Sequence, residues 1–187
     1  GNIMTHIGDG ATVGLVRGKA NIVTKVGDGL GVNAAWGHAN ILTHVGDGDR
    51  YNFAKGDANI ITKVGDGQEV SVVQGKANVI THVGNGDDYT GSWAKANIIT
   101  KVGDGRNVVL AKGEANIVTQ VGDGDSFNAL WSKGNIVTKV GDGIQVTAAK
   151  GKANITTTVG NGLSVTATYA DANINTKIGD GLSLIHI

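Results

Sequence analysis

The sequence lacks cysteine and proline, and its aromatic residues are limited to three Trp, three Tyr and two Phe among 187 residues. Without cysteine the chain has no disulfide framework, thiol nucleophile or thiolate metal site. No apolar run approaches the roughly 20 residues of a membrane-spanning helix, and no secretory signal opens the chain. The 16 basic residues balance the 16 acidic ones, which argues against a nucleic-acid partner because such proteins need a basic surface.

Glycine is abundant, with 31 residues, well above its usual share of roughly 7%. These glycines do not recur at every third position, which excludes collagen. Instead the chain repeats every nineteen residues: Asn recurs from Asn2 to Asn173 without a slip, and Thr follows three places later each time. The unit reads Asn-Ile-x-Thr-x-Val-Gly-Asp-Gly, followed by a variable arm ending near Gly-Lys-Ala. We therefore interpret residues 1–187 as a single array of ten repeats.

A second period of 38 overlies the first. The place after Thr holds Lys in alternate repeats and His, Gln or Thr in the others, and Tyr51, Tyr89 and Phe127 also recur at 38. The repeats are therefore paired into unequal 38-residue units.

Within each repeat a stretch of alternating residues, rich in Ile, Val and Thr, predicts a strand that the Gly-Asp-Gly turn ends. The variable arm alternates too. Strand, turn, strand and turn of fixed length predict an all-β fold, a β-solenoid (β-helix or β-roll) of 19-residue repeats. The coil holds either 19 or 38 residues, and the longer coil would stack Tyr51, Tyr89 and Phe127 as an aromatic ladder. A five-bladed propeller of 38-residue blades is a weaker alternative, because it does not explain the 19-residue period.

The repeated columns suggest a scaffold. Ile22 and Val26 are expected in the core, with Thr24 on the same buried face. Buried hydroxyls and stacked amides need hydrogen-bond partners, so the Asn and Thr columns are predicted to form structural ladders. The ladder residues of four successive repeats are Asn21, Asn40, Asn59, Asn78, Thr24, Thr43, Thr62 and Thr81.

An acidic column offers a candidate cation site. Stacked carboxylates repel one another unless they are exposed, hydrogen-bonded or bridged by a cation, and hard Ca²⁺ prefers such oxygens. The column consists of Asp9, Asp28, Asp47, Asp66, Asp104, Asp123, Asp142 and Asp180, with Asn85 and Asn161 in the other two repeats. The nonapeptide calcium pattern is absent, so the favoured interpretation is that each Asp caps its own turn. No cofactor other than calcium is expected, and His6, His44 and His82 are interpreted as a solvated column rather than a metal site.

Aromatic residues near the end of the variable arm form the candidate contact with a membrane or partner: Trp36, Trp93, Trp131 and Tyr169. Packing over a coil edge or a neighbouring Gly is the favoured interpretation of these rings. The sequence contains no triad, P-loop or dinucleotide motif, and catalytic sites do not repeat evenly ten times, so no enzymatic activity is expected.

Two motifs, Thr-x-Val-Gly-x-Gly and Gly-x7-Gly-x-x-Asn, resemble the glycine-rich repeats of the multifunctional-autoprocessing repeats-in-toxin (MARTX) family. The second occurs as Gly29 followed by Gly37-His38-Ala39-Asn40 and recurs along the whole chain. The departures are conservative: Ile7, Ile178, Ala94, Ser132, Ala170 and Gly134 replace the usual residues.

This resemblance implies a fragment of a very large secreted bacterial toxin, a virulence protein whose repeats act at the host plasma membrane. They would assist pore formation or translocation of effector domains. The partners implied are that membrane and neighbouring repeats of the same toxin. Uncapped solenoid ends also predict self-association. Two alternatives remain: a passive stalk of an adhesin, and an ice-binding solenoid, against which the expected burial of the Thr column argues.

Overall fold

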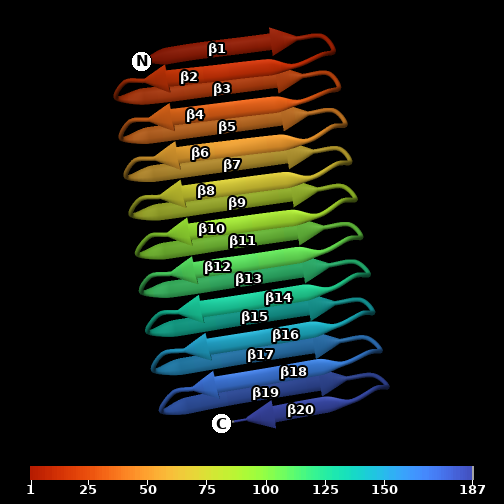
Figure 1. Ribbon diagram of the computed structural model, residues 1–187. Helices are drawn as coiled ribbons and strands as arrows, with labels where there is room; N and C mark the ends of the chain where they lie inside the picture. The colour runs from red at the N-terminus through yellow and green to blue at the C-terminus, as the bar shows by residue number, and fades with distance from the viewer. Residues whose placement is uncertain (187) are drawn as a thin grey trace.

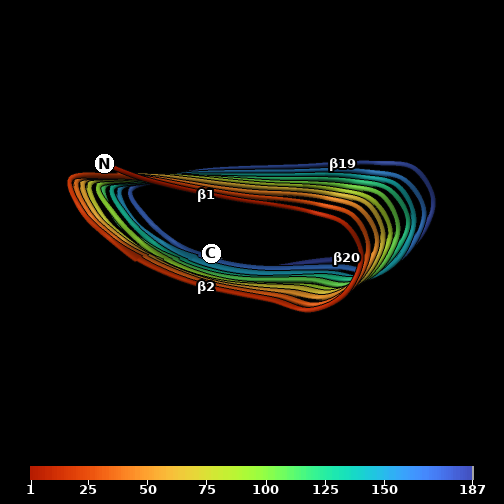
Figure 2. The ribbon, with the colours of Figure 1, turned by 90° about the horizontal axis from the view of Figure 1, so that it is seen from above.

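The computed structural model describes residues 1–186, which form an all-β solenoid without a helix in that range. Each coil contributes one strand to each of two parallel sheets, and the coils stack into a rod (Figure 1). Viewed down the rod, the two sheets enclose a narrow interior, and successive coils are slightly displaced from one another (Figure 2).

From the second coil onward, the longer strand of each coil belongs to sheet A, whereas the two strands of the first coil both have six residues. The members of sheet A are β1 (Asn2–Ile7), β3 (Ala20–Val26), β5 (Ala39–Val45), β7 (Ala58–Val64), β9 (Ala77–Val83), β11 (Ala96–Val102), β13 (Ala115–Val121), β15 (Gly134–Val140), β17 (Ala153–Val159) and β19 (Ala172–Ile178). The variable arms form sheet B. Its members are β2 (Thr12–Arg17), β4 (Gly31–Trp36), β6 (Arg50–Lys55), β8 (Glu69–Gln74), β10 (Asp88–Trp93), β12 (Asn107–Lys112), β14 (Ser126–Trp131), β16 (Gln145–Lys150), β18 (Ser164–Tyr169) and β20 (Ser183–His186).

The coil holds nineteen residues, which resolves the choice between 19 and 38. Every residue pairs with its equivalent one repeat later, as Asn21 does with Asn40. Tyr51 therefore pairs with Val32 and Val70, and the contiguous aromatic ladder of a 38-residue coil does not form. The 38-residue period survives as an alternation of residue types along each column.

The Gly-Asp-Gly turns require glycine at both ends. Gly103 and Gly105 have φ angles of +128° and +117°, which residues with a Cβ rarely adopt. A Cβ on Gly103 would also lie 2.2 Å from the carbonyl oxygen of Gly84 in the preceding coil. The stacking of coils and the backbone conformation thus both select glycine.

In sheet A the strand face that points into the interior is the opposite of the one expected. Asn21, Val23 and Lys25 point inward and are each 1% exposed, whereas Ile22 and Val26 are 37% and 40% exposed. The prediction that the Ile22 and Val26 columns form the core is therefore wrong. Thr24 lies on their face, as expected, but that face is the outer one and Thr24 is half-buried. Alternation defines two faces of a strand without stating which faces inward.

Many of the polar side chains inside, the Asn21 column above all, are hydrogen-bonded, whereas both amide atoms of Asn33 and of Asn107 are buried without a hydrogen-bond partner. Within the interior a single aliphatic row from sheet A, which includes Val23 and Leu42, packs against residues of sheet B that range in size from Ala35 to Val73 and Leu130. The Asn amides and Lys ammonium groups lie on either side of this row, near the two sets of turns.

Candidate functional site

An amide ladder runs through the interior along the whole rod. Asn21 Nδ2 donates to Asn40 Oδ1 at 2.8 Å, and each Asn repeats this bond to the next one, up to Asn173. The same amide of Asn21 also donates to the backbone oxygen of Trp36 at 2.9 Å. The Thr column forms no comparable ladder, because hydrogen bonds between successive Thr hydroxyls are not found among residues 1–186. Half-buried positions on the outer face are occupied by Thr24, Thr43, Thr62 and Thr81.

The acidic column has a structural role that differs from the expected one. Asp9 Oδ1 accepts the backbone N–H of Asp28 at 3.0 Å, and Asp28 Oδ1 accepts that of Asp47 at 2.8 Å. Each carboxylate therefore caps the turn of the next coil rather than its own. Asn85 and Asn161 make the same bond through their amide oxygens, to Asp104 and Asp180. A second, shorter column occurs in alternate coils and consists of Asp49, Asp87 and Asp125. Each of these carboxylates accepts the backbone N–H of the equivalent residue in the next coil.

Buried lysines supply positive charge behind this column. Lys139 Nζ donates to the turn oxygens of Gly141 at 3.1 Å and Asp142 at 2.8 Å. Burial lowers the pKa of Lys139, while the nearby carboxylates of Asp123 and Asp142 oppose that shift. Lys25, Lys63, Lys101 and Lys177 reach turn oxygens in the same way. The chain itself therefore places an ammonium group where a cation would balance the carboxylates.

The histidines share the lysine column rather than forming one of their own. His44 stacks between Lys25 and Lys63, and His44 and His82 are at most 1% exposed. The prediction of a solvated His column is therefore wrong for these two residues. Burial lowers the pKa of His44, with further contributions from Arg50, Lys25 and Lys63.

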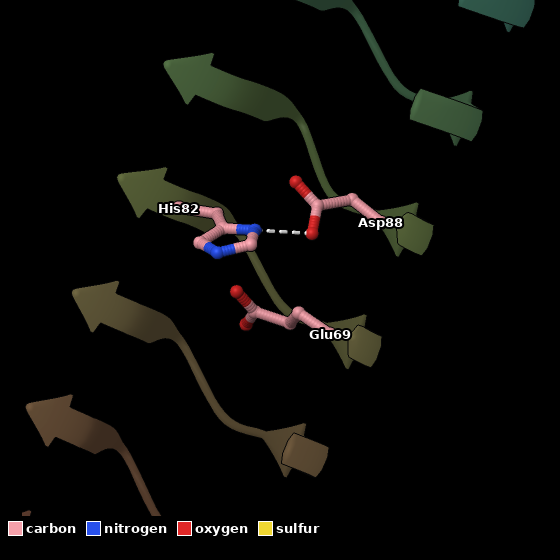
Figure 3. Close-up of side chains that lie close together, drawn as sticks. All are labelled: Glu69, His82 and Asp88. Carbon is pink, nitrogen blue, oxygen red and sulfur yellow. Dashed lines mark hydrogen bonds and ion pairs between the residues drawn. The ribbon is translucent and has the colours of Figure 1, made fainter. Parts of the chain in front are cut away.

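A cluster of buried charges lies in the middle of the rod, where Glu69, His82 and Asp88 converge (Figure 3). One atom of each, a carboxylate oxygen or an imidazole nitrogen, lies within 4.8 Å of the corresponding atoms of the other two. Within residues 1–186 the side chains of the acidic column form no such group of three or more possible metal ligands. His82 Nδ1 bonds the Asp88 carboxylate, and Lys101 Nζ lies 3.8 Å from the other Asp88 oxygen.

Glu69 completes this cluster. Its Oε1 accepts hydrogen bonds from Ser71 at 2.8 Å and Asn52 at 3.1 Å, and burial, followed by the charge of Asp88, raises its pKa. Arg50 lies close enough to oppose that rise. The cluster already contains its own cations and its histidine nitrogen is engaged, so we interpret it as an internal charge network. Sequence reasoning missed it, although charged residues in successive arms at Arg50, Glu69 and Asp88 were the available signal.

The two outer faces are both apolar but differ in chemistry. Face A is the outer side of sheet A. Its three columns of larger side chains begin at Ile3, Thr5 and Ile7, and a further outward column of Ala, with Gly134 in one coil, lies at the start of the strands. Every residue in the three columns of larger side chains is Ile, Val or Thr. Face B is the outer side of sheet B and carries all eight aromatic residues of the described chain: Trp36, Tyr51, Phe53, Tyr89, Trp93, Phe127, Trp131 and Tyr169.

Aromatic and basic residues alternate along one column of face B. Trp36, Trp93 and Trp131 are 37%, 38% and 43% exposed, and Tyr169 is 75% exposed. The register places basic residues or Gln between them, namely Arg17, Lys55, Gln74, Lys112 and Lys150. Lys150 Nζ lies 5.6 Å from the centre of the Tyr169 ring, and the Trp36 and Phe53 rings are 6.0 Å apart. The sequence identified the aromatic residues, but their alternation with cations emerges only when the coils are stacked.

An open groove of about 690 Å³ borders this column and is lined by Arg17, Trp36, His38, Lys55, Asp57 and Lys76, among others. Asp57 accepts hydrogen bonds from His38 at 3.0 Å and Lys76 at 3.1 Å, and these bonds lower its pKa.

The two edges of the rod carry opposite charge. The acidic edge is formed by the Gly-Asp-Gly turns. Its cations are Arg106 and the five lysines that bond the turn oxygens from inside, Lys25, Lys63, Lys101, Lys139 and Lys177. They are outnumbered by Asp9, Asp28, Asp47, Asp49, Asp66, Asp87, Asp104, Asp123, Asp125, Asp142 and Asp180. The basic edge, formed by the Gly-Lys-Ala turns and the adjoining column of face B, holds Arg17, Lys19, Lys55, Lys76, Lys95, Lys112, Lys133, Lys150 and Lys152 against Asp57, Glu114 and Asp171. The formal net charge of zero thus conceals a separation of charge across the rod.

Comparisons with known proteins agree with the repeat architecture. A family model described as RtxA repeat matches ten segments, at residues 1–14, 18–33, 35–52, 54–71, 75–90, 93–109, 111–128, 132–143, 149–166 and 170–185. No curated protein sequence matches the chain, and no solved structure matches it. Helices long and apolar enough to cross a membrane are not found in the part of the chain that the structure describes.

Proposed function

Because the chain belongs to the RtxA repeat family, and is therefore a structural repeat module of RTX type, we propose that it is part of a large secreted toxin of the MARTX kind. In this proposal the module engages the host plasma membrane and assists pore formation or translocation of effector domains. RTX repeat proteins are typically secreted, in keeping with the extracellular part of this proposal.

Face B is the observation that carries the membrane assignment. Trp and Tyr favour the boundary between lipid and water because their rings combine an apolar body with a polar group. Basic residues near an anionic leaflet contribute attraction of about 1 kcal/mol each. A column in which Trp36, Trp93 and Trp131 alternate with cations, beside an apolar sheet surface, supports binding of the rod on an anionic bilayer through face B.

The stacking register supports the proposed contact with neighbouring repeats. Each coil bonds the next through equivalent residues, as Asn21 bonds Asn40 and Asn40 bonds Asn59. Repeats of the same length can continue the same ladders.

Liposome flotation tests the membrane proposal. The wild-type chain is expected to float with vesicles containing phosphatidylserine and to float less with purely zwitterionic vesicles. Replacing Trp36, Trp93 and Trp131 with Gln, which occupies this column naturally at Gln74, should abolish flotation. The matched control replaces Ile98, Ile117 and Ile136 of face A, which are 41%, 37% and 40% exposed, with Gln and should still float.

The same gradients distinguish the remaining interpretations. Recovery of the wild type at the bottom of every gradient would instead favour a passive stalk. Flotation that requires calcium, and that chelator or Asp-to-Asn changes abolish, would assign the acidic column a ligand role.

The ice-binding alternative gains support from one observation. Burial of the Thr column argued against it, but Thr24 and its equivalents lie on an outer sheet face between exposed Ile and Val. Thermal hysteresis in dilute solution would support this second function.

A further inference from the structure

Face A is an uncharged surface that runs the full length of the rod. Its outer columns are aliphatic, with Ile98 and Val102 exposed by 41% and 39%, and its central column is Thr throughout. Neither an aromatic nor a charged residue occurs in these three columns. Large contiguous apolar surfaces of this kind are rare on monomers and mark interaction sites.

The size of face A matches that of a stable protein interface. Ten strands about 4.8 Å apart extend over about 45 Å, and the three columns cover a width of about 18 Å. Face A therefore offers about 800 Å² per copy, which is the contribution of one partner to an interface of standard size.

The order of the columns makes face A complementary to itself. Thr is the middle column between Ile and Val, so when two copies pack face to face the Thr column of one lies over that of the other. Thr hydroxyls that lose water in such an interface can then pair with each other across it. The aliphatic columns on both sides bury apolar surface, which is the main driving force for association.

The charged edges select one of two symmetric arrangements. Strands of sheet A run from the basic edge to the acidic edge. A two-fold axis parallel to the rod reverses the strand direction in the partner and places the acidic edge of each copy over the basic edge of the other. An axis parallel to the strands would place like charges together, which is unfavourable.

We propose that face A is the interface of a parallel homodimer, in which equivalent coils of two copies face each other. A lipid surface fits face A less well, because the aromatic residues that favour bilayers lie on face B and the three columns of face A carry no basic residue. This dimer does not depend on the proposed membrane function, since it uses the opposite face of the rod.

Sedimentation equilibrium between about 1 and 500 µM tests the dimer. The wild type is expected to dimerise, and Thr81→Lys with Thr100→Lys should weaken dimerisation at least tenfold because two charges would be buried. Val72→Lys with Leu110→Lys is the matched control on face B, at 37% and 40% exposure, and should leave dimerisation unchanged. A wild type that stays monomeric, or equal weakening by both pairs, would overturn the proposal, as would thermal hysteresis from a monomer.

A dipolar distance measurement tests the orientation with nearly wild-type protein. A nitroxide on Thr24→Cys lies in the second coil and should be within about 20 Å of its partner in the parallel dimer, since packed sheets are about 10 Å apart. In an antiparallel dimer the second coil would face the ninth, and the labels would be about 35 Å apart. The longer distance would refute the parallel arrangement.

Discussion

At the scale of single residues, the unusual feature is an interior in which long charged side chains are almost fully buried. Lys63 and Arg50 are 0% exposed, and burial lowers the pKa of both, that of Arg50 to about 10. Buried charges are costly unless they are paired and hydrogen-bonded. In this rod the turn carbonyls accept hydrogen bonds from Lys63. Arg50 donates to the Asn52 side chain and to the backbone carbonyl of Thr43, while its Nη2 is buried without a partner.

The buried His44 should make stability depend on pH. Its pKa is lowered from 6.5 in the folded chain, so below pH 6.5 the unfolded chain binds a proton that the folded chain does not. The contribution of His44 is therefore complete above its unfolded pKa and lost as pH falls through the folded one. Between pH 7.5 and 5 the urea midpoint should fall more for the wild type than for His44→Gln, which copies Gln120 of the same column.

The control for this prediction is His186→Gln, because His186 is an exposed residue of the last strand. This variant should follow the wild-type dependence on pH. Identical slopes for wild type and His44→Gln would show that His44 does not couple to folding.

At the scale of strands and turns, stability rests on ladders that continue from coil to coil. The Asn amides connect the interior, the Asp side chains connect the acidic turns, and the glycines allow adjacent turns to stack closely. Each is a repeated contact between neighbours, as expected for a quasi-one-dimensional protein. A defect in one coil therefore acts on the two coils that flank it.

Two glycine substitutions compare a position where close stacking requires glycine with a position where it does not. Gly103→Ala would require a Cβ at φ +128° and 2.2 Å from Gly84 O, and should destabilise the fold by about 2–4 kcal/mol. A Cβ added at Gly134 would have no atom within 4 Å other than those of its own and the two adjoining residues, and Ala occupies the equivalent position in the neighbouring coils. Gly134→Ala should therefore stabilise the fold by about 0.4–1 kcal/mol. Urea denaturation measures both, and equal effects would contradict this account.

At the scale of the whole molecule, the rod has two apolar faces and two oppositely charged edges around a polar interior. This distribution separates the surface that we propose to bind a bilayer from the surface that we propose to bind a second copy. Because every coil has the same length, both surfaces extend with the number of repeats rather than with any single residue.

Deletion of a complete coil should therefore be tolerated better than a smaller deletion. Removing residues 134–152 joins equivalent positions, and Asn116 can then bond Asn154 as it now bonds Asn135. Removing only residues 134–143 deletes β15 and leaves β14 and β16 without a return strand. The first variant should keep the circular dichroism and cooperative unfolding of the wild type, whereas the second should lose several kcal/mol of stability, despite lacking fewer residues. The reverse order would refute the coil as the unit of stability.

The repeat of nineteen, the strands and the glycine turns could be read directly from the sequence because they depend on local spacing and backbone conformation. The stacked Asn and Asp columns followed from the same spacing. Only the tertiary structure decided which side of each strand faces inward and that the coil holds nineteen residues. The burial of Lys25, the exposure of Ile22 and the outward position of the half-buried Thr24 follow from these. The physical reason is that alternation along a strand defines two faces but does not determine which of them is buried. The turns that close the coil decide which face points inward.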